Sequence, residues 1–114
     1  MTRGELWWAD FGMPFGSESG YRRPVLILQN DFYNNSKINT IVVVPLTTNI
    51  LYADAPGNIV INKKDSKLSK DSVLVVSQIR AIDKKRLIEK ISKINRTMIL
   101  ELDNNILFLL GIIR

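Results

Sequence analysis

Residues 16–31 read GSESGYRRPVLILQND, a polar, glycine-rich segment that runs directly into an apolar one. The first half has two glycines, a carboxylate and two adjacent arginines without any periodic pattern, which is typical of a loop. Pro24 then opens the partly β-branched run from Val25 to Leu28, which is typical of a buried strand. We therefore expect a loop that leads into a strand edge. Its donors and positive charge indicate an anion site, and the alternative is a solvated polar turn.

Short apolar runs continue at close spacing after this stretch, and one precedes it. We expect strands at residues 4–10, 25–28, 41–46, 59–61 and 72–80, with turn-rich or basic loops such as 30–36 and 62–71 between them. Pro45 cannot donate to a strand ladder, so pairing on one side of its strand should stop or bulge there. Residues 88–94 carry isoleucines at helical spacing, but the segment is short and we favour an edge strand.

The end of the chain has a helical pattern. Asp83 is a candidate N-cap for one helical turn at 83–87. From Asn95 onward the apolar residues form a stripe at helical spacing, made by Ile99, Leu102, Ile106, Leu109 and Ile113. Further apolar residues widen this surface, so the helix needs cover from the barrel and from either a partner subunit or its own loops. Short strands without crossover helices, followed by this helix, predict a mainly β (α+β) fold built on a small antiparallel barrel.

Length and composition limit the kind of protein. The 114 residues fit one domain, 1–114, which buries roughly two-thirds of its unfolded surface. The sequence has no signal-peptide core and no apolar run of membrane-spanning length, so we expect a cytoplasmic protein without membrane contact. The net charge of +5 indicates an acidic partner, either a nucleic acid or an acidic protein segment.

Cysteine and histidine are both absent from the sequence. This excludes disulfides, thiol nucleophiles, zinc sites built on these residues and proton transfer by imidazole. The carboxylates are scattered without the spacing of a metal site, so we expect a site without metal or cofactor. Any catalysis must then use carboxylates, hydroxyls, arginine, lysine, tyrosine or backbone dipoles.

Three polar clusters interrupt the apolar strand ends. They are residues 16–23, residues 47–49, and Ser77 and Gln78 with Arg80. Polar residues at the ends of several strands of one small barrel are expected to converge on one surface, which is a usual way to build a site. The alternative for each cluster is that a strand end is polar because a loop begins there.

Two further features have alternative interpretations. Trp7 and Trp8 point to opposite faces if they lie on a strand, and the outward one is either cover for a core or interface, or a platform for base stacking. The lysine-rich loop at residues 63–70 is either a solvated hairpin tip or a source of electrostatic steering for a polyanion.

Five motifs in order along the chain resemble the MazF/PemK toxin endoribonucleases of bacterial toxin-antitoxin pairs. They are RGELWWADF at 3–11, GSE at 16–18, RRPV at 22–25 with QND at 29–31, PLTTN at 45–49, and SQIRAIDK at 77–84. Each motif alone is weak, but five in sequence with suitable lengths between them are specific. The match covers almost the whole chain.

The resemblance implies an SH3-like barrel with a C-terminal helix, assembled as a homodimer. It implies an mRNA interferase that cleaves single-stranded RNA at short sequence motifs without metal and thereby inhibits translation and growth. It also implies neutralisation by a cognate antitoxin, whose acidic C-terminal segment wraps the toxin.

The resemblance also suggests the site residues. Arg23 and Thr47 are similar to the catalytic arginine and threonine of the family. Because a guanidinium is a poor general base, Arg23 should mainly stabilise charge, and Glu18 is the better base on chemical grounds. The remaining candidates are assigned to RNA binding, and they are Ser17, Arg22, Thr48, Asn49, Gln78 and Arg80.

One residue departs from the family pattern. Ser19 stands where the family commonly has glutamine in Gly-Ser-Glu-Gln-Gly, which affects the expected sequence preference more than catalysis. Two alternatives of other classes remain at this point. One is a non-catalytic toxin of the same architecture that poisons a protein such as DNA gyrase, and the other is a plain RNA-binding barrel.

Overall fold

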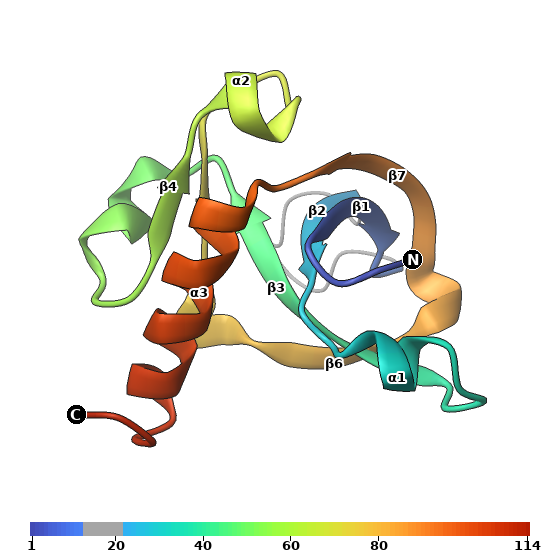
Figure 1. The fold of residues 1–114 in the computed structure, drawn as a ribbon. Coiled ribbons are helices and arrows are strands. Elements are labelled where there is room, and N and C mark those ends of the chain that lie inside the picture. Colours follow the sequence, from blue (N-terminus) through green and yellow to red (C-terminus); the bar gives the residue numbers. More distant parts are fainter. Residues whose placement is uncertain (13–21) are drawn as a thin grey trace.

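The computed structural model describes residues 1–12 and 22–114. Figure 1 shows a strongly curved sheet with a long helix, α3, packed beside it. The strands are β1 (Glu5–Asp10), β2 (Arg22–Ile27), β3 (Thr40–Thr47), β4 (Ile59–Ile61), β5 (Ser72–Leu74), β6 (Arg80–Asp83) and β7 (Leu87–Lys93). The helices are α1 (Asp31–Asn34), α2 (Lys63–Ser66) and α3 (Arg96–Leu109), with 3-10 turns η1 (Ile50–Asp54), η2 (Val76–Gln78) and η3 (Lys84–Arg86).

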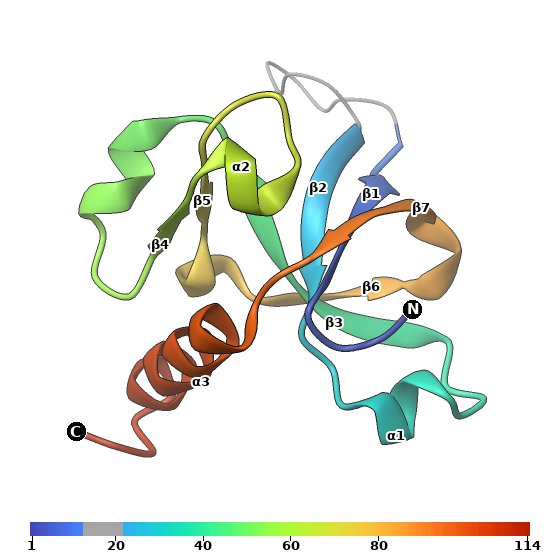
Figure 2. The same ribbon diagram turned by 45° about the horizontal axis from the view of Figure 1, so that its top comes forward.

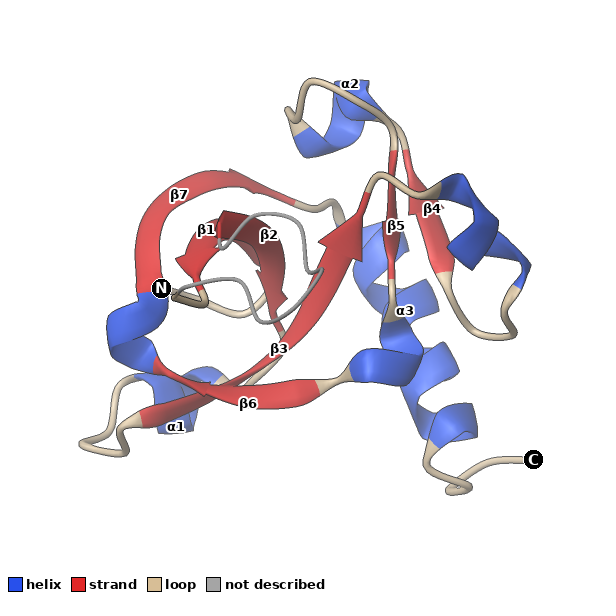
Figure 3. Ribbon diagram, turned by 180° about the vertical axis from the view of Figure 1, so that it is seen from behind, coloured by secondary structure: helices blue, strands red, loops and turns tan. Residues whose placement is uncertain are grey.

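The strands form one antiparallel sheet in the order β4-β5-β3-β2-β1-β7, with β6 paired to β3 off this path. In Figures 1 and 3, β7 curls around β1 and β2, while β6 crosses the open side of the curl. The sheet is therefore a half-barrel closed on one side by α3. The predicted fold, a mainly β small antiparallel barrel with a C-terminal helix, is confirmed.

β3 is the strand on which the sheet changes partners. Residues from Thr40 to Val43 pair with β6, whereas Leu46 and Thr47 pair with β5. Pro45 lies at the change, where its carbonyl accepts a hydrogen bond of 2.9 Å from the N–H of Val75. Proline has no N–H to donate, so it suits the position where one ladder ends and the next begins. The prediction that pairing stops on one side at Pro45 is confirmed.

Two hydrophobic cores occupy opposite faces of the sheet, and β2 contributes to both. Leu26 belongs to a core under α3 that also contains Leu6 and Leu102. Val25 and Ile27 belong to the second core. Because successive side chains of a strand point to opposite faces, a strand buried on both faces is apolar without interruption. This explains the continuous run after Pro24.

α3 begins at a conventional cap and is only half covered. The side chain of Asn95 accepts a hydrogen bond from the N–H of Met98. Ile99, Leu102 and Ile106 pack on the first core as predicted. Leu109 ends the helix with 44% of its surface exposed, and Ile113 follows it with 38% exposed. Figure 2 shows this end of α3 pointing away from the sheet, so the predicted stripe is buried only in its first half.

The expectation of a single strand at residues 72–80 is wrong. β5 ends at Leu74, the turn η2 follows, and β6 begins at Arg80. The break moves the chain from one segment of β3 to the other, while Val75 and Val76 stay buried within it. An apolar run can thus continue through a break in pairing, because burial alone does not distinguish a strand from a buried turn.

Of four other segments, two contain short helices that the sequence did not predict, and two agree with the sequence predictions. The turn-rich segment at 30–36 holds α1, capped by the side chain of Asn30, and the basic loop holds α2, capped by Asn62. Asp83 caps η3 as predicted. β7 is an edge strand, also as predicted. Within the described ranges, no helix is both long enough and apolar enough to cross a membrane.

A buried carboxylate joins β1 to β7. Glu5 accepts hydrogen bonds of 2.9 Å from the Trp7 indole N–H and from the Thr2 backbone N–H. Its other oxygen lies 3.2 Å from Lys90 Nζ. Burial acts to raise the pKa of Glu5, but these donors outweigh it and lower the pKa from its usual 4.5 to about 2. Glu5 is therefore ionised at neutral pH and serves as a structural anchor that also holds the Trp7 ring.

Candidate active site

A pocket of about 270 Å³ lies where β2 begins and β3 ends. The two strands are antiparallel neighbours, so the first residues of β2 lie beside the last residues of β3. The loop between α2 and β5 forms the facing wall. The pocket is lined by Trp8, Arg22, Arg23, Pro24, Leu46, Thr47, Thr48, Leu68, Ser69, Lys70 and Ser72.

The pairing of β2 with β3 brings the two main candidates to the same pocket. β2 and β3 pair with Val25 opposite Pro45. Two residues beyond this pair come Arg23 on β2 and Thr47 on β3, and both line the pocket. Because every second residue of a strand points to the same face, Arg23 shares a face with Val25, and Thr47 shares a face with Pro45. A guanidinium and a hydroxyl thus reach the same small volume.

The pocket is strongly cationic. Arg22, Arg23 and Lys70 line it, and no acidic side chain is among its described lining residues. Arginine binds a phosphate through two parallel N–H donors, and lysine binds it as a point charge. The volume suits a phosphate with part of a nucleotide and is below that of typical drug-sized sites. The arrangement is therefore suited to binding an anion.

The hydroxyl of Thr47 is oriented by the chain that follows it. Thr47 Oγ1 accepts a hydrogen bond of 3.2 Å from the backbone N–H of Asn49. Asn49 in turn caps η1, because its side chain accepts from the N–H of Leu51 at 3.1 Å. A hydroxyl that accepts in this way still has its own hydrogen to donate. Thr47 is thereby prepared to donate to an anion.

The α2–β5 loop, residues 67–71, is held firmly at the pocket. Ser92 of β7 donates a 2.5 Å hydrogen bond to the carbonyl of Ser66. Ser66 Oγ accepts from the N–H of Leu68 at 3.0 Å, and Asp71 accepts from the N–H of Lys63 at 2.7 Å. Lys67 has the left-handed conformation that ends α2, with φ of 66°. These contacts fix the loop that carries Lys70.

The structure brings two of the three predicted clusters together. Arg22, Arg23, Thr47 and Thr48 all line the pocket. The third cluster lies elsewhere: Gln78 is exposed on η2, and the Arg80 guanidinium stacks over the Phe11 ring at 5.0 Å. Asn49 lies behind Thr47 and outside the lining. Ser17 and Glu18, with Ser19, lie outside the described residues, so their assignments stay predictions.

Sequence reasoning did not assign Leu68 or Lys70 to the site. The lysine-rich composition of their loop gave a general signal of polyanion steering, but several lysines share that loop. The hydrogen bond between Ser92 of β7 and Ser66 of α2 positions the loop so that Lys70 lines the pocket. Within residues 1–12 and 22–114, no group of three or more acidic side chains gathers in a way that could hold a metal ion.

Comparison with known proteins now places this geometry in a family. The profile of the PemK-like, MazF-like toxins of type II toxin-antitoxin systems matches residues 2–110. The chain belongs to this toxin family. A relative named endoribonuclease MazF, from Staphylococcus epidermidis, is 42% identical over 112 residues, covering 98% of this chain and 92% of the relative. Endoribonuclease MazF6 of Mycobacterium tuberculosis is 34% identical over 106 residues, covering 93% of each chain.

Solved structures of MazF toxins share the fold. The MazE-MazF structure from Deinococcus radiodurans superposes with a TM-score of 0.78 at 24% identity, covering 99% of this chain and 97% of that one. Mycobacterium tuberculosis toxin MazF-mt6 gives a TM-score of 0.76 at 18% identity, covering 94% of this chain and 96% of that one. The comparisons confirm the family that the five motifs indicated, along with its barrel.

Proposed function

We propose that this MazF-family endoribonuclease cleaves single-stranded mRNA at a short sequence motif, without a metal ion, and so inhibits translation and growth. The supporting observation is the cationic pocket that Arg23 and Thr47 both line. The curated relatives are endoribonucleases by name, and the matched family is one of toxins. Since RNA is the proposed substrate, the cytoplasm is the proposed site of action.

The proposed reaction uses the nucleophile that RNA itself carries. The 2′-hydroxyl loses its proton to a base and attacks the adjacent phosphorus, and the P–O5′ bond breaks. The products are a 2′,3′-cyclic phosphate and a 5′-hydroxyl, whose oxygen takes up a proton. The enzyme must therefore hold the in-line geometry, stabilise the phosphorane charge and move two protons.

Arg23 and Thr47 are proposed to stabilise the negative charge of the phosphorane. Arg23 binds the phosphorane oxygens through its N–H fork, and the Thr47 hydroxyl donates to the same group. Arg22 and Lys70 add positive charge that attracts the phosphate groups of the RNA backbone. Glu18 is the proposed base on chemical grounds. Ser17, Thr48, Asn49, Gln78 and Arg80 are proposed to contact RNA.

The partners are also part of the proposal. One structural neighbour is an endoribonuclease in complex with its cognate antitoxin. For this chain, a net charge of +5 and the cationic pocket favour an antitoxin with an acidic C-terminal segment.

A homodimer is proposed from the apolar surface that α3 leaves uncovered. Monomeric proteins rarely expose large contiguous apolar patches, and such patches mark interfaces. On and after the second half of α3, the exposed large hydrophobic side chains are Leu107, Phe108, Leu109, Leu110, Ile112 and Ile113.

The central test is cleavage of a long, weakly structured transcript in EDTA. We expect discrete fragments with 5′-hydroxyl ends. Arg23→Ala should lower the cleavage rate by about 100-fold or more, because one donor to a charged transition state is worth about 10²–10³ in rate. Arg96→Ala, which removes an exposed arginine at the start of α3, is the matched control and should cleave normally. Intact RNA with the wild-type protein would overturn the proposal.

A further inference from the structure

A second, smaller pocket of about 220 Å³ adjoins the candidate active site. It is lined by Trp8, Arg22 and Glu89. Trp8 and Arg22 also line the first pocket, so these two side chains form the wall between the pockets. Successive nucleotides of a bound strand would place a base on one side of this wall and the cleaved phosphate on the other.

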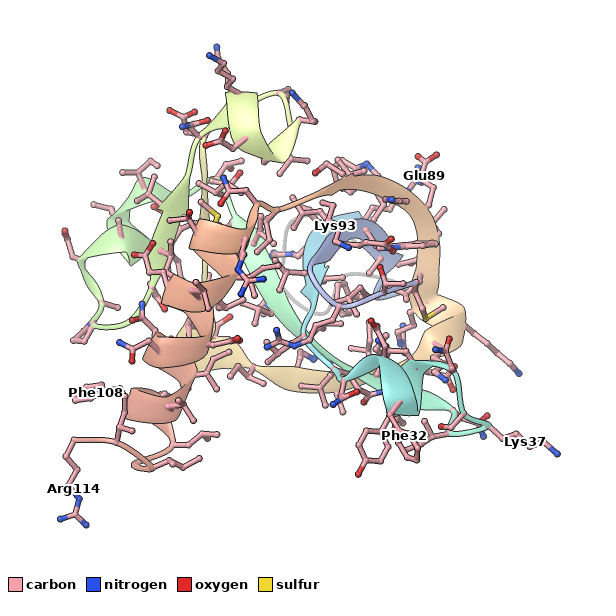
Figure 4. The ribbon with its side chains drawn as sticks, in the orientation of Figure 1. Phe32, Lys37, Glu89, Lys93, Phe108 and Arg114 are labelled. Atoms are coloured by element: carbon pink, nitrogen blue, oxygen red, sulfur yellow. The ribbon has the colours of Figure 1, made fainter. Side chains whose placement is uncertain are left out.

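The three side chains come from three neighbouring strands. Trp8 of β1 pairs directly with Glu89 of β7 on one side and with Pro24 of β2 on the other. Paired residues of this kind share a face of the sheet. Figure 4 shows Glu89 projecting outward from β7. A half-buried indole therefore lies between a carboxylate and the arginine-bearing end of β2.

The polar groups of this pocket are not used by the described part of the fold. The neighbouring Trp7 indole donates to Glu5, and Lys90 pairs with Glu5. By contrast, within residues 1–12 and 22–114 neither the Trp8 indole N–H nor the Glu89 carboxylate makes a side-chain hydrogen bond or ion pair, although the backbones of both residues take part in strand pairing. An aromatic face and an acceptor-only carboxylate are thus directed to the surface beside a phosphate-binding site.

We propose that this pocket binds the base of the nucleotide next to the cleaved phosphate and selects a base with an exocyclic amino group. This inference rests on the proposed function. The base stacks on the Trp8 ring, its amino group donates to Glu89, and Arg22 binds the phosphate between the two pockets. Proteins read unpaired RNA by this combination of stacking and hydrogen bonds to base edges.

Cytosine and uracil provide the sharpest discrimination at such a site. Both are pyrimidines of the same size and stack comparably. Cytosine carries an amino donor at C4, which a carboxylate accepts, whereas uracil carries a carbonyl oxygen there, which a carboxylate repels. A preference for cytosine over uracil that depends on Glu89 would thus report the hydrogen bond and not the stacking.

The test uses hexamers of 2′-O-methyl cytidine and 2′-O-methyl uridine, which lack the nucleophilic hydroxyl and are not cleaved. Binding is followed by tryptophan fluorescence. We expect the cytidine hexamer to bind about tenfold more tightly than the uridine hexamer, in line with the worth of one good base contact. Glu89→Gln should reduce this ratio to less than about threefold. Glu101→Gln, which changes an exposed carboxylate on α3, is the matched control and should leave the ratio unchanged.

Trp8→Phe keeps an aromatic ring in place and should preserve binding while most of the fluorescence change disappears. A circular dichroism spectrum checks that each variant is folded. Equal binding of the two hexamers, or a ratio that Glu89→Gln leaves unchanged, would overturn the inference. RNA cleavage in EDTA without base discrimination refutes only this inference. Discrimination without cleavage refutes only the proposed function.

Discussion

At the scale of single residues, the Thr47 hydroxyl is held by a backbone hydrogen bond in the orientation that its proposed catalytic role requires. The N–H of Asn49 donates to it at 3.2 Å, which leaves its own hydrogen to donate into the pocket. Thr47→Val removes the hydroxyl at nearly constant shape and should lower kcat/KM by about 100-fold. Thr47→Ser keeps the hydroxyl and should stay within about tenfold of the wild-type value. Steady-state cleavage of a fluorogenic RNA containing the mapped motif measures both, and equal losses for the two variants would exclude a hydroxyl role.

Lys70 should contribute one phosphate contact. It lines the pocket on a loop fixed by Ser66, whereas Lys64 is exposed on α2 and lies outside the pocket lining. Binding to a non-cleavable RNA should weaken in Lys70→Ala. The slope of log affinity against log salt should become shallower by about 0.7, which corresponds to one contact on a single strand. Lys64→Ala serves as the control with the same change of charge. Identical slopes for the two variants would place Lys70 outside the RNA contact.

At the scale of elements, Glu5 couples the stability of β1 and β7 to pH. Its pKa is about 2 in the folded protein, below the usual 4.5. A lowered folded-state pKa stabilises the protein above the unfolded-state pKa, and this stabilisation is lost as pH falls from about 4.5 to about 2. Glu5→Gln should therefore reduce the free energy of unfolding at pH 7 by about 2–3 kcal/mol.

Urea denaturation between pH 7 and pH 2 measures this effect. The wild-type protein should lose stability more steeply than Glu5→Gln below about pH 4.5, so the two curves should approach each other. If the free energies of unfolding of the two proteins fall in parallel as pH decreases, Glu5 is not the group that makes stability depend on pH. Glu101→Gln is the control for loss of a surface carboxylate.

Helices and strands that a local sequence pattern determines were predicted correctly. Those that depend on contacts between distant parts of the chain were missed. The apolar runs of β2 and β3 and the helical period that starts after Asn95 are local signals, and each was interpreted correctly. Asn30 and Asn62 cap short helices, but asparagine is equally typical of turns. The break after Leu74 exists because β3 changes partners there, which no local pattern records.

The same distinction between local patterns and distant contacts applies to the residues of the candidate site. Arg23 and Thr47 were predicted because both belong to sequence motifs, and the pocket contains them both. Lys70 reaches the pocket only because Ser92 anchors α2 to β7, 26 residues away in sequence. The sequence predicted that Trp7 and Trp8 point to opposite faces, but the place of Trp8 between two pockets depends on the pairing of three strands.

At the scale of the whole molecule, the proposed dimer predicts a defined change of mass. Leu110 and Ile112 are 62% and 65% exposed beyond the end of α3. Replacing both with glutamate places charge in the proposed interface, where it is costly. Light scattering after gel filtration should give twice 13.0 kDa for the wild-type chain and 13.0 kDa for the double variant.

Phe32→Glu is the control for this experiment, because Phe32 is 77% exposed on α1 and Figure 4 places it well away from Phe108 and the C-terminus. The control should keep the dimeric mass. A wild-type mass of 13.0 kDa, or a dimer that survives in the double variant, would contradict the proposed interface.

The register of β2 against β3 has a consequence for how such toxins diversify. Arg23 and Thr47 lie two residues beyond the Val25–Pro45 pair, and a slip by one residue would exchange the side chains of β2 between the two cores. Insertions before Arg22 or after Asn49 leave this pairing of β2 with β3 intact. On the proposed function, we therefore expect the RNA motif to vary through those flanking segments while cleavage by Arg23 and Thr47 is retained.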